Sequence, residues 1–455
     1  MAFDQQYGFR RSLVESLERD MLGPREPREV IADPPATTYV TGVLFPMNEG
    51  LIDPDQDNDA PEEDDDSGTL DTPVALAHVR YPSSMGLTFA VDLRSVRIIT
   101  VHVSAARYEP LEQLHEDSSE PQASLSRGAP TTRWQRLPLD IQPFDIDVSV
   151  PIHEKWFGLS DGLDLYARVR RADERDAATV TLVLVNKLPA PPGHNRDRVA
   201  FFQPAIRVEA QHVAAFVDRR RPLSPTDDSD LRSYRLLFRH ITAIAVGHGC
   251  STAWTDSVET PGRARAVWTT FIPRCEVPVA DSNPKVQSDA LRMRFLATGD
   301  RSRVTHELEG FCRGYGDWIE LQRPEMSSLE AEFGHTPYEH LAGCQDALGR
   351  MQKGVTLLQS DDHSWQAFQF ANKAMLQVRA RTVWRDGGRR SEGPQEDDSH
   401  VWRPFQLAFV LLCLESIGNR GSEDRDIADL LWFPTGGERP RPTWRSSPSL
   451  HFSGG

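Results

Sequence analysis

The N-terminal segment places apolar residues with the period of an α-helix. They recur at three- and four-residue steps, at Phe9, Leu13, Val14, Leu17, Met21 and Leu22. This spacing predicts an amphipathic helix that ends at Gly23-Pro24, because proline does not continue a helix. We expect the apolar face to need a partner surface. Residues 37–46 are rich in β-branched and aromatic side chains, which predicts a short strand or a tight packing segment.

Short β-branched runs dominate the chain between about residues 73 and 280. Clusters of Pro, Gly, Asp and Ser separate them, and the clearest runs are 87–92, 96–103, 145–150, 163–170, 178–186, 205–210 and 264–272. Many short strands with such turn signals are typical of β-sandwiches and barrels. We therefore predict two packed β layers in this region.

The apolar period becomes helical from about residue 303. One stripe holds Leu308, Phe311, Cys312, Tyr315, Trp318 and Ile319, a second holds Leu341, Cys344, Leu348, Met351, Val355 and Leu358, and a third holds Trp365, Phe368, Met375, Leu376 and Val383. These stripes predict an antiparallel helix pair and a third helix that is capped near Asp361 or Asp362. We interpret them as core, because no polar residue interrupts them as a cofactor site would require.

The charge pattern limits the surfaces that nucleic acid can use. The formal net charge is −16, from 51 basic and 67 acidic side chains, and argues against binding over the whole surface. The segment from Asp53 to Asp66 holds a large part of the excess, so a local basic groove stays possible. We interpret this tract as a disordered loop, because like charges repel and apolar residues are scarce. It lacks the glycine and the spacing of a calcium loop, so no metal is expected.

The cysteines and the apolar runs indicate the compartment. The five cysteines are too far apart for a CxxC zinc or redox pair, and their odd, sparse count favours reduced thiols. No run of 18 apolar residues and no signal-peptide pattern occurs, so we expect a soluble, cytoplasmic protein without a membrane partner.

The run Gly247-His248-Gly249-Cys250 favours a tight turn. A hydrolase that uses His248 and Cys250 is the weakest functional alternative.

The last sixty residues carry the candidate chemistry. A buried helix is predicted after 401–406 and ends at Gly418, residues 426–433 are predicted to form a strand, and Pro434-Thr435-Gly436-Gly437 follows directly. Helix, strand and glycine-rich turn are the approach to a phosphate-binding loop, whose next residues are a lysine for phosphate and a hydroxyl for magnesium. Here the next residues are Glu438-Arg439-Pro440. A carboxylate repels phosphate and a proline removes a donor, so the loop is incomplete.

Six segments between Arg10 and Gly437 carry a family resemblance. They are RRSLVESLERDMLGP, TYVTGVLFP, SSMGLTF, AVGHGC, WRPFQLAFVLLCL and DLLWFPTGG. They resemble the N-terminal part of the helicase of the DISARM antiphage defence system, a superfamily 2 helicase. The resemblance implies ATP-driven translocation on DNA, ATP and magnesium as cofactors, and a second DISARM core protein as partner.

The resemblance also assigns residues to an incomplete ATP site. Gln406 matches the adenine-reading glutamine of the family, and Phe405 matches the adjacent aromatic residue. Pro434, Thr435, Gly436 and Gly437 match the start of the nucleotide loop. The lysine and the hydroxyl residue of the family have no counterpart, so no catalytic residue is assigned.

The match stops after Gly437. Reading the tail one reverse step out of frame permits Glu-Ala-Glu-Ala-Tyr-Leu-Ala-Val-Val-Ala-Phe-Thr, which resembles the helix that follows the loop in the family. We therefore expect residues 438–455 to be a frameshifted tail, in the gene or in the sequencing, and the chain to be a truncated helicase without ATPase activity.

The alternative is a non-catalytic module of the defence complex that binds DNA or a partner. The residues at 405–414 and 429–433 are expected to be exposed or poorly ordered.

The predicted fold class is α+β, with a sandwich- or barrel-like region, a helical region and the start of an incomplete RecA-like motor domain. The predicted boundaries are 1–72 for the N-terminal helix, strand and acidic loop (53–66), 73–280 for the β-rich domain, 300–386 for the helical domain, 387–400 for a linker, 401–437 for the motor start and 438–455 for the tail.

Overall fold

The computed structural model describes residues 2–47, 81–111, 132–171, 176–190, 196–211, 213–224, 226–257, 259–274, 286, 288–389 and 392–429. The acidic tract at 53–66 and the loop at 434–437 lie outside them. The chain divides into a sheet unit of Met1–Arg221 with Arg239–Arg274, and a helical unit of Pro222–Phe238 with Cys275–Gly455. The predicted combination of a β-rich and a helical region is therefore confirmed.

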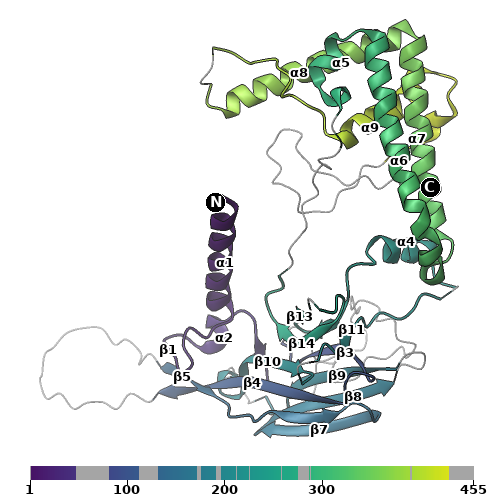
Figure 1. Ribbon diagram of the computed structural model, residues 1–455. Helices are drawn as coiled ribbons and strands as arrows, with labels where there is room; N and C mark the ends of the chain where they lie inside the picture. Colours follow the sequence, from purple (N-terminus) through teal and green to yellow (C-terminus); the bar gives the residue numbers. More distant parts are fainter. Residues whose placement is uncertain are drawn as a thin grey trace, which may run out of the picture. The chain divides into compact units, whose positions relative to one another are not determined.

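The sheet unit begins with helices and short strands and continues as a series of longer strands (Figure 1). Its elements are α1 (Ala2–Met21), β1 (Val30–Ile31), α2 (Pro35–Thr38), β2 (Val43–Leu44), β3 (Ser84–Asp92), β4 (Ile98–Leu111), β5 (Arg133–Pro138), β6 (Phe144–Asp147), β7 (Ile152–Ser160), β8 (Leu163–Arg171), β9 (Ala177–Asn186), β10 (Phe201–Glu209), β11 (Phe216–Val217), β12 (Ala245–His248), β13 (Ser251–Asp256) and β14 (Ala264–Thr270). The segment 37–46, predicted as a short strand or a tight packing segment, thus contains the end of α2 and the two-residue strand β2.

The strands of the sheet unit join into one antiparallel sheet. Its hydrogen-bonded order is β1-β5-β4-β10-β14-β11-β3-β9-β8-β7, with β2 on β10, β6 on β4, β12 on β3 and β13 on β14. Some neighbouring strands are consecutive in the sequence, such as β7, β8 and β9, and others come from distant parts of it. For example, β3 pairs with β9 through Leu87 and Leu182, and β4 pairs with β10 through Val103 and Ile206.

The core of the sheet unit gathers side chains from strands that lie far apart in this order. Phe89 of β3 and Val103 of β4 belong to one buried cluster. Phe144 of β6 and Phe157 of β7 pack with their ring centroids 4.9 Å apart, although β7 ends the strand order and β6 pairs with β4 near its other end. The sheet therefore curls so that one face encloses the core, as in sandwich- and barrel-like folds.

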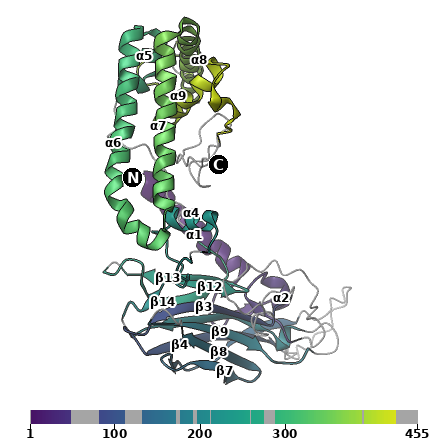
Figure 2. The same cartoon turned by 90° about the vertical axis from the view of Figure 1, so that its right-hand side faces the viewer.

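The helical unit contains the helices that the sequence predicts from residue 303 onwards, and two shorter helices, at 229–237 and 293–298, that it does not predict. The first of these lies in the range 73–280 that was expected to be β-rich. Its elements are α4 (Ser229–Leu237), α5 (Met293–Thr298), α6 (Arg301–Phe333), α7 (Thr336–Ser360), α8 (Asp362–Asp386) and α9 (Pro404–Gly418), with 3₁₀ turns at Asp289–Leu291 and Glu423–Asp426. Figure 2 shows α6 and α7 side by side, as the predicted antiparallel pair requires. The predicted cap of α8 is confirmed, because the Asp361 carboxylate accepts a hydrogen bond from the Ser364 amide at 2.7 Å.

Parts of the predicted apolar stripes are exposed instead of buried. Trp318 on α6 is 45 % exposed, and Met375 and Val383 on α8 are 36 % and 44 % exposed. The buried face of α8 is instead set by Trp365, Phe368, Asn372, Leu376 and Ala380. The buried face of α8 thus includes a polar residue, Asn372, although the sequence predicts an uninterrupted apolar stripe. Burial of Asn372 is tolerated because its side-chain amide donates to the Phe368 carbonyl at 2.9 Å.

The helix α9 packs inside the helical unit, so the expectation that residues 405–414 lack a packing surface is wrong. Leu407, Leu411 and Leu412 are almost fully buried in the same cluster as Met351 and Val355 of α7. The strand predicted from residue 426 is also wrong over its described part, because Glu423–Asp426 form a 3₁₀ turn and residues 427–429 form no strand. Residues 430–433 lie outside the described part. No helix in the described ranges is both long and apolar enough to cross a membrane.

Candidate functional site

The two described residues of the predicted ATP site lie in the first turn of α9. Pro404 begins the helix, and Phe405 and Gln406 follow it, both partly buried. The Gln406 Oε1 accepts a hydrogen bond from the Arg403 amide at 3.1 Å. The glutamine therefore satisfies a backbone donor at the helix start, which is the role of the third residue in a capping box. Pro434, Thr435, Gly436 and Gly437 lie outside the described residues.

Contacts on both sides of this turn fix its position in the helical unit. The Trp402 indole Nε1 donates to the Asn372 Oδ1 of α8 at 2.8 Å, and the Trp402 amide donates to the Leu291 carbonyl at 2.7 Å. On α7, a Cβ added to Gly354 would meet the Leu411 carbonyl oxygen at 2.1 Å. The backbones of α7 and α9 thus approach more closely than a side chain at position 354 would permit.

An ion-pair cluster that the sequence did not reveal holds the segment after α9. Arg350 of α7 donates to both carboxylate oxygens of Asp429, at 2.8 and 2.7 Å, and its side chain is only 12 % exposed. Asp424 lies 3.7 Å from the Arg350 Nε and 3.5 Å from the Lys353 Nζ. The hydrogen bond to Asp429 raises the pKa of Arg350 above its ordinary value. This bidentate pair anchors the chain immediately before residue 430.

The signal for this cluster in the sequence is weak. Arg350 stands next to Met351 in an apolar stripe, where a charge needs a partner, but nothing local says which carboxylate supplies it. The partner Asp429 is 79 positions away. Cys413 lies at the edge of the cluster, 4.0 Å from the Asp429 Oδ2, and burial raises the pKa of its thiol.

The residues of the alternative hydrolase site form a tight turn, as the sequence predicts. Gly249 has a φ of +67°, and β12 and β13 flank the turn. His248 is 3 % exposed, and its Nε2 is hydrogen-bonded to the Thr88 Oγ1 at 2.8 Å. The Cys250 thiol donates to the Gly86 carbonyl at 3.1 Å, and burial raises its pKa to about 12. A thiol in this state is a poor nucleophile near neutral pH.

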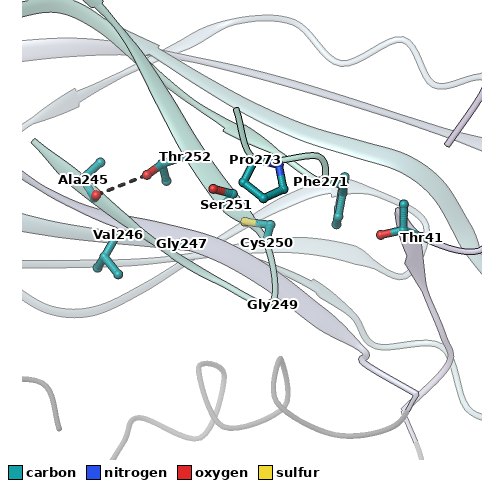
Figure 3. Close-up of a pocket in the computed structure, with 10 residues that line it drawn as sticks. All are labelled: Thr41, Ala245, Val246, Gly247, Gly249, Cys250, Ser251, Thr252, Phe271 and Pro273. Carbon is teal, nitrogen blue, oxygen red and sulfur yellow. Dashed lines mark hydrogen bonds between the residues drawn. The ribbon is translucent and has the colours of Figure 1, made fainter. Parts of the chain in front are cut away.

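A pocket of about 480 Å³ opens beside this turn (Figure 3). Thr41, Phe271 and Pro273 line one part of it, and the β12–β13 hairpin lines the rest. The Thr252 Oγ1 donates to the Ala245 carbonyl across the hairpin at 3.2 Å. Cys250 is the single ionisable side chain among the ten lining residues, so the pocket lacks a general base to act with the thiol. The geometry does not support the hydrolase alternative.

A second buried polar cluster fixes the N-terminal segment on the sheet. The Glu29 carboxylate accepts hydrogen bonds from the hydroxyls of Tyr39 and Tyr108, the latter at 2.5 Å, and from the Arg25 amide at 2.9 Å. Burial, followed by the hydrogen bond to Glu29, raises the pKa of Tyr39 to about 12. The cluster satisfies a buried carboxylate and joins the segment before β1 to β4, which is a structural role.

Comparison with known proteins identifies a relative among the curated proteins. Over an aligned length of 476 residues the chain is 24 % identical to the DISARM protein DrmA of Bacillus paralicheniformis, and the alignment covers 94 % of this chain and 39 % of that protein. The chain thus spans about two fifths of the length of the curated relative. No family model matches the chain. Within the described ranges, no group of three His, Cys, Asp or Glu residues could hold a metal ion. The predicted kinship is confirmed at the level of a DrmA-like relative.

Proposed function

We propose that this chain acts in DISARM-type antiphage defence as the N-terminal region of a superfamily 2 helicase. The observation that carries the proposal is the extent of the similarity to DrmA, which covers 94 % of this chain. Of the six segments that carry the family resemblance, five lie between α1 in the sheet unit and α9 in the helical unit, and the sixth, 429–437, follows α9. In this proposal the two units are binding regions that serve the helicase, with DNA and a second DISARM core protein as their partners.

The residues at the predicted nucleotide site do not fit Mg-ATP. The Gln406 Oε1, which would read adenine, is hydrogen-bonded to the Arg403 amide. Glu438 stands where the loop needs a donor, and Pro440 has no N–H to offer. A carboxylate near phosphate oxygens is repulsive, and no lysine follows Gly437. We therefore derive no ATP-dependent step from this chain and propose that its own contribution is binding.

An ATPase assay tests the nucleotide part of this proposal. We expect purified protein, with and without single- or double-stranded DNA, to release no phosphate above the rate of a Gln406→Ala variant. The matched control is Gln359→Ala, on the exposed side of α7 in the same unit. Turnover that Gln406→Ala abolishes and Gln359→Ala preserves would show a working site and contradict the proposal.

Phage challenge tests the defence part independently. Removing this coding region from the defence locus of its host should increase phage plating, and supplying the intact chain should restore protection. DNA binding is measured by fluorescence anisotropy at two salt concentrations, because contacts with phosphates weaken as salt rises. Unchanged plating would exclude a role in defence. Restored protection without DNA affinity would favour the partner-binding role over the DNA-binding role.

A further inference from the structure

The helix α1 carries an apolar ridge that its own unit leaves exposed. Phe9, Leu13 and Leu17 follow each other at four-residue steps and are 73 %, 59 % and 49 % exposed. The neighbouring face with Val14 and Met21 is partly buried. The sequence predicts that the apolar face of this helix needs a partner surface, and the ridge is the part of that face that stays exposed.

The helix α8 carries a second exposed ridge with the same spacing. Phe370 and Val378 are 73 % and 55 % exposed, and Ala374 between them is exposed as well. The opposite face of α8 contributes Trp365 and Phe368 to the core of the helical unit. The exposed ridge is therefore an additional apolar surface and not a misplaced part of the core.

The two ridges share the same residue spacing, and they complement each other in size at one level and in charge at another. Each ridge begins at a phenylalanine. Four positions later α1 has the large Leu13 and α8 has the small Ala374, so Leu13 can fill the space beside Ala374. Eleven positions after each phenylalanine, and on the same face, stand Asp20 and Arg381. When the helices run parallel, these opposite charges come level with each other.

The charged residues at the ends of the ridges are accessible. Arg381 is exposed, and the Asp20 side chain is 61 % exposed. Asp20 lies 3.2 Å from Arg25, whose side chain is 72 % exposed. A pair this exposed contributes little to stability, so Asp20 can exchange Arg25 for another cation.

We propose that α1 of one copy of this chain docks, in parallel, on α8 of a second copy. In a dimer with two-fold symmetry this contact occurs twice, with α1 of each copy on α8 of the other. Each contact buries one ridge against the other and brings Asp20 of one copy to Arg381 of the other. The interface removes two apolar surfaces from water at once, and it does not depend on the proposed function.

Sedimentation equilibrium of the full chain tests the dimer. We expect reversible dimerisation, and we expect Leu13→Asp and Val378→Asp each to raise the dissociation constant by about tenfold or more, because a carboxylate would enter an apolar contact. Leu321→Asp is the matched control, since Leu321 on α6 is 73 % exposed and lies on neither ridge. A monomer at every concentration, or an equal effect of the control, would overturn the proposal.

Cross-linking and charge reversal test the orientation. A Leu17→Cys chain mixed with a Val378→Cys chain should form a disulfide between copies under mild oxidation, because these positions come level in the parallel arrangement. Asp20→Arg should weaken the dimer, and Asp20→Arg combined with Arg381→Asp should restore it. A disulfide that forms only when both cysteines are in one chain would assign the contact to a single copy and overturn the dimer. Failure of the double charge reversal to restore association would overturn the parallel pairing.

Discussion

At the scale of single residues, stability depends on a few buried polar groups that are fully paired. Glu29 is 7 % exposed and accepts three hydrogen bonds, two of them from tyrosine hydroxyls. Removing one hydrogen-bonding group from such a cluster leaves its former partner buried, with neither water nor another protein group to bond to. The energetic effect of a substitution here is therefore much larger than at the exposed charges of the same unit.

Glu29→Gln should lower the free energy of unfolding of the sheet unit by about 1–3 kcal/mol. The reason is that an amide nitrogen, which is itself a donor, would replace one of the two oxygens that now accept hydrogen bonds. Urea unfolding followed by tryptophan fluorescence measures the change. Glu259→Gln is the control, since Glu259 is 78 % exposed in its pair with Arg265 and its loss should change stability by less than about 0.5 kcal/mol. Equal effects of the two substitutions would contradict the structural role of Glu29.

The same cluster predicts a dependence on alkaline pH. Burial and the hydrogen bond to Glu29 raise the pKa of Tyr39 to about 12 in the folded protein, above the value of about 10 for an unfolded tyrosine. The neutral hydroxyl therefore stabilises the fold fully below pH 10, and this contribution is lost as the pH rises towards 12.

The stability difference between the natural protein and Tyr39→Phe should accordingly shrink as the pH rises from about 9 to about 12. Urea unfolding at a series of pH values measures this difference directly. Tyr7→Phe serves as the control, because Tyr7 is 47 % exposed on α1. A difference for Tyr39→Phe that stays constant over this range would show that the hydroxyl contributes nothing through its protonation.

At the scale of elements, the close packing of α7 against α9 explains why α9 is ordered in this chain. Gly354 has no side chain, so the Leu411 carbonyl of α9 lies where a Cβ would be. Gly349, on α7 like Gly354, has nothing within 4 Å of an added Cβ. Alanine at either position gains the same helix preference, but only alanine at position 354 disturbs the contact with α9. Comparing the two substitutions therefore isolates the energetic cost of disturbing that contact.

Gly354→Ala should lower the free energy of unfolding of the helical unit by about 1–3 kcal/mol, because α7 and α9 must move apart. Gly349→Ala should raise it by up to about 1 kcal/mol, because alanine favours a helix over glycine. Thermal unfolding followed by circular dichroism at 222 nm measures both. Stabilisation by both substitutions would mean that α9 does not pack on α7 in solution.

Local patterns in the sequence predict the elements better than they predict the contacts between them. The cap of α8 at Asp361 and the turn at Gly249 are confirmed because the residues that determine each lie within a few positions. The packing of α9 was missed because it depends on Gly354, which looks unremarkable within its own helix. The pair of Arg350 and Asp429 was missed because its partners are 79 positions apart. Residues 434–437 stay a sequence prediction, since they lie outside the described residues.

At the scale of the whole molecule, each unit has a hydrophobic core of its own. The core of the sheet unit contains Phe89 and Phe216, and that of the helical unit contains Leu308 and Leu411. Separate cores allow the units to unfold in separate steps. The chain also leaves the sheet unit after Arg221, contributes α4 to the helical unit, and returns at Arg239.

Differential scanning calorimetry should therefore resolve two transitions. Glu29→Gln should lower the midpoint of one transition and Gly354→Ala the midpoint of the other, because each substitution affects a different core. The double variant should show both shifts, unchanged in size, because the sites share no partner. A single transition that both substitutions shift equally would mean that the two units unfold as one.

The return of the chain to the sheet at Arg239 has a consequence for cleavage of the backbone. A protease that cuts between Arg221 and Arg239 leaves β12, β13 and β14 on the C-terminal fragment, while β3 and β10, with which β12 and β14 pair, stay on the N-terminal fragment. The ladder hydrogen bonds and the shared core would hold the fragments together after the peptide bond is gone. The chain is in this sense suited to division into two separately expressed fragments that reassemble on the same sheet.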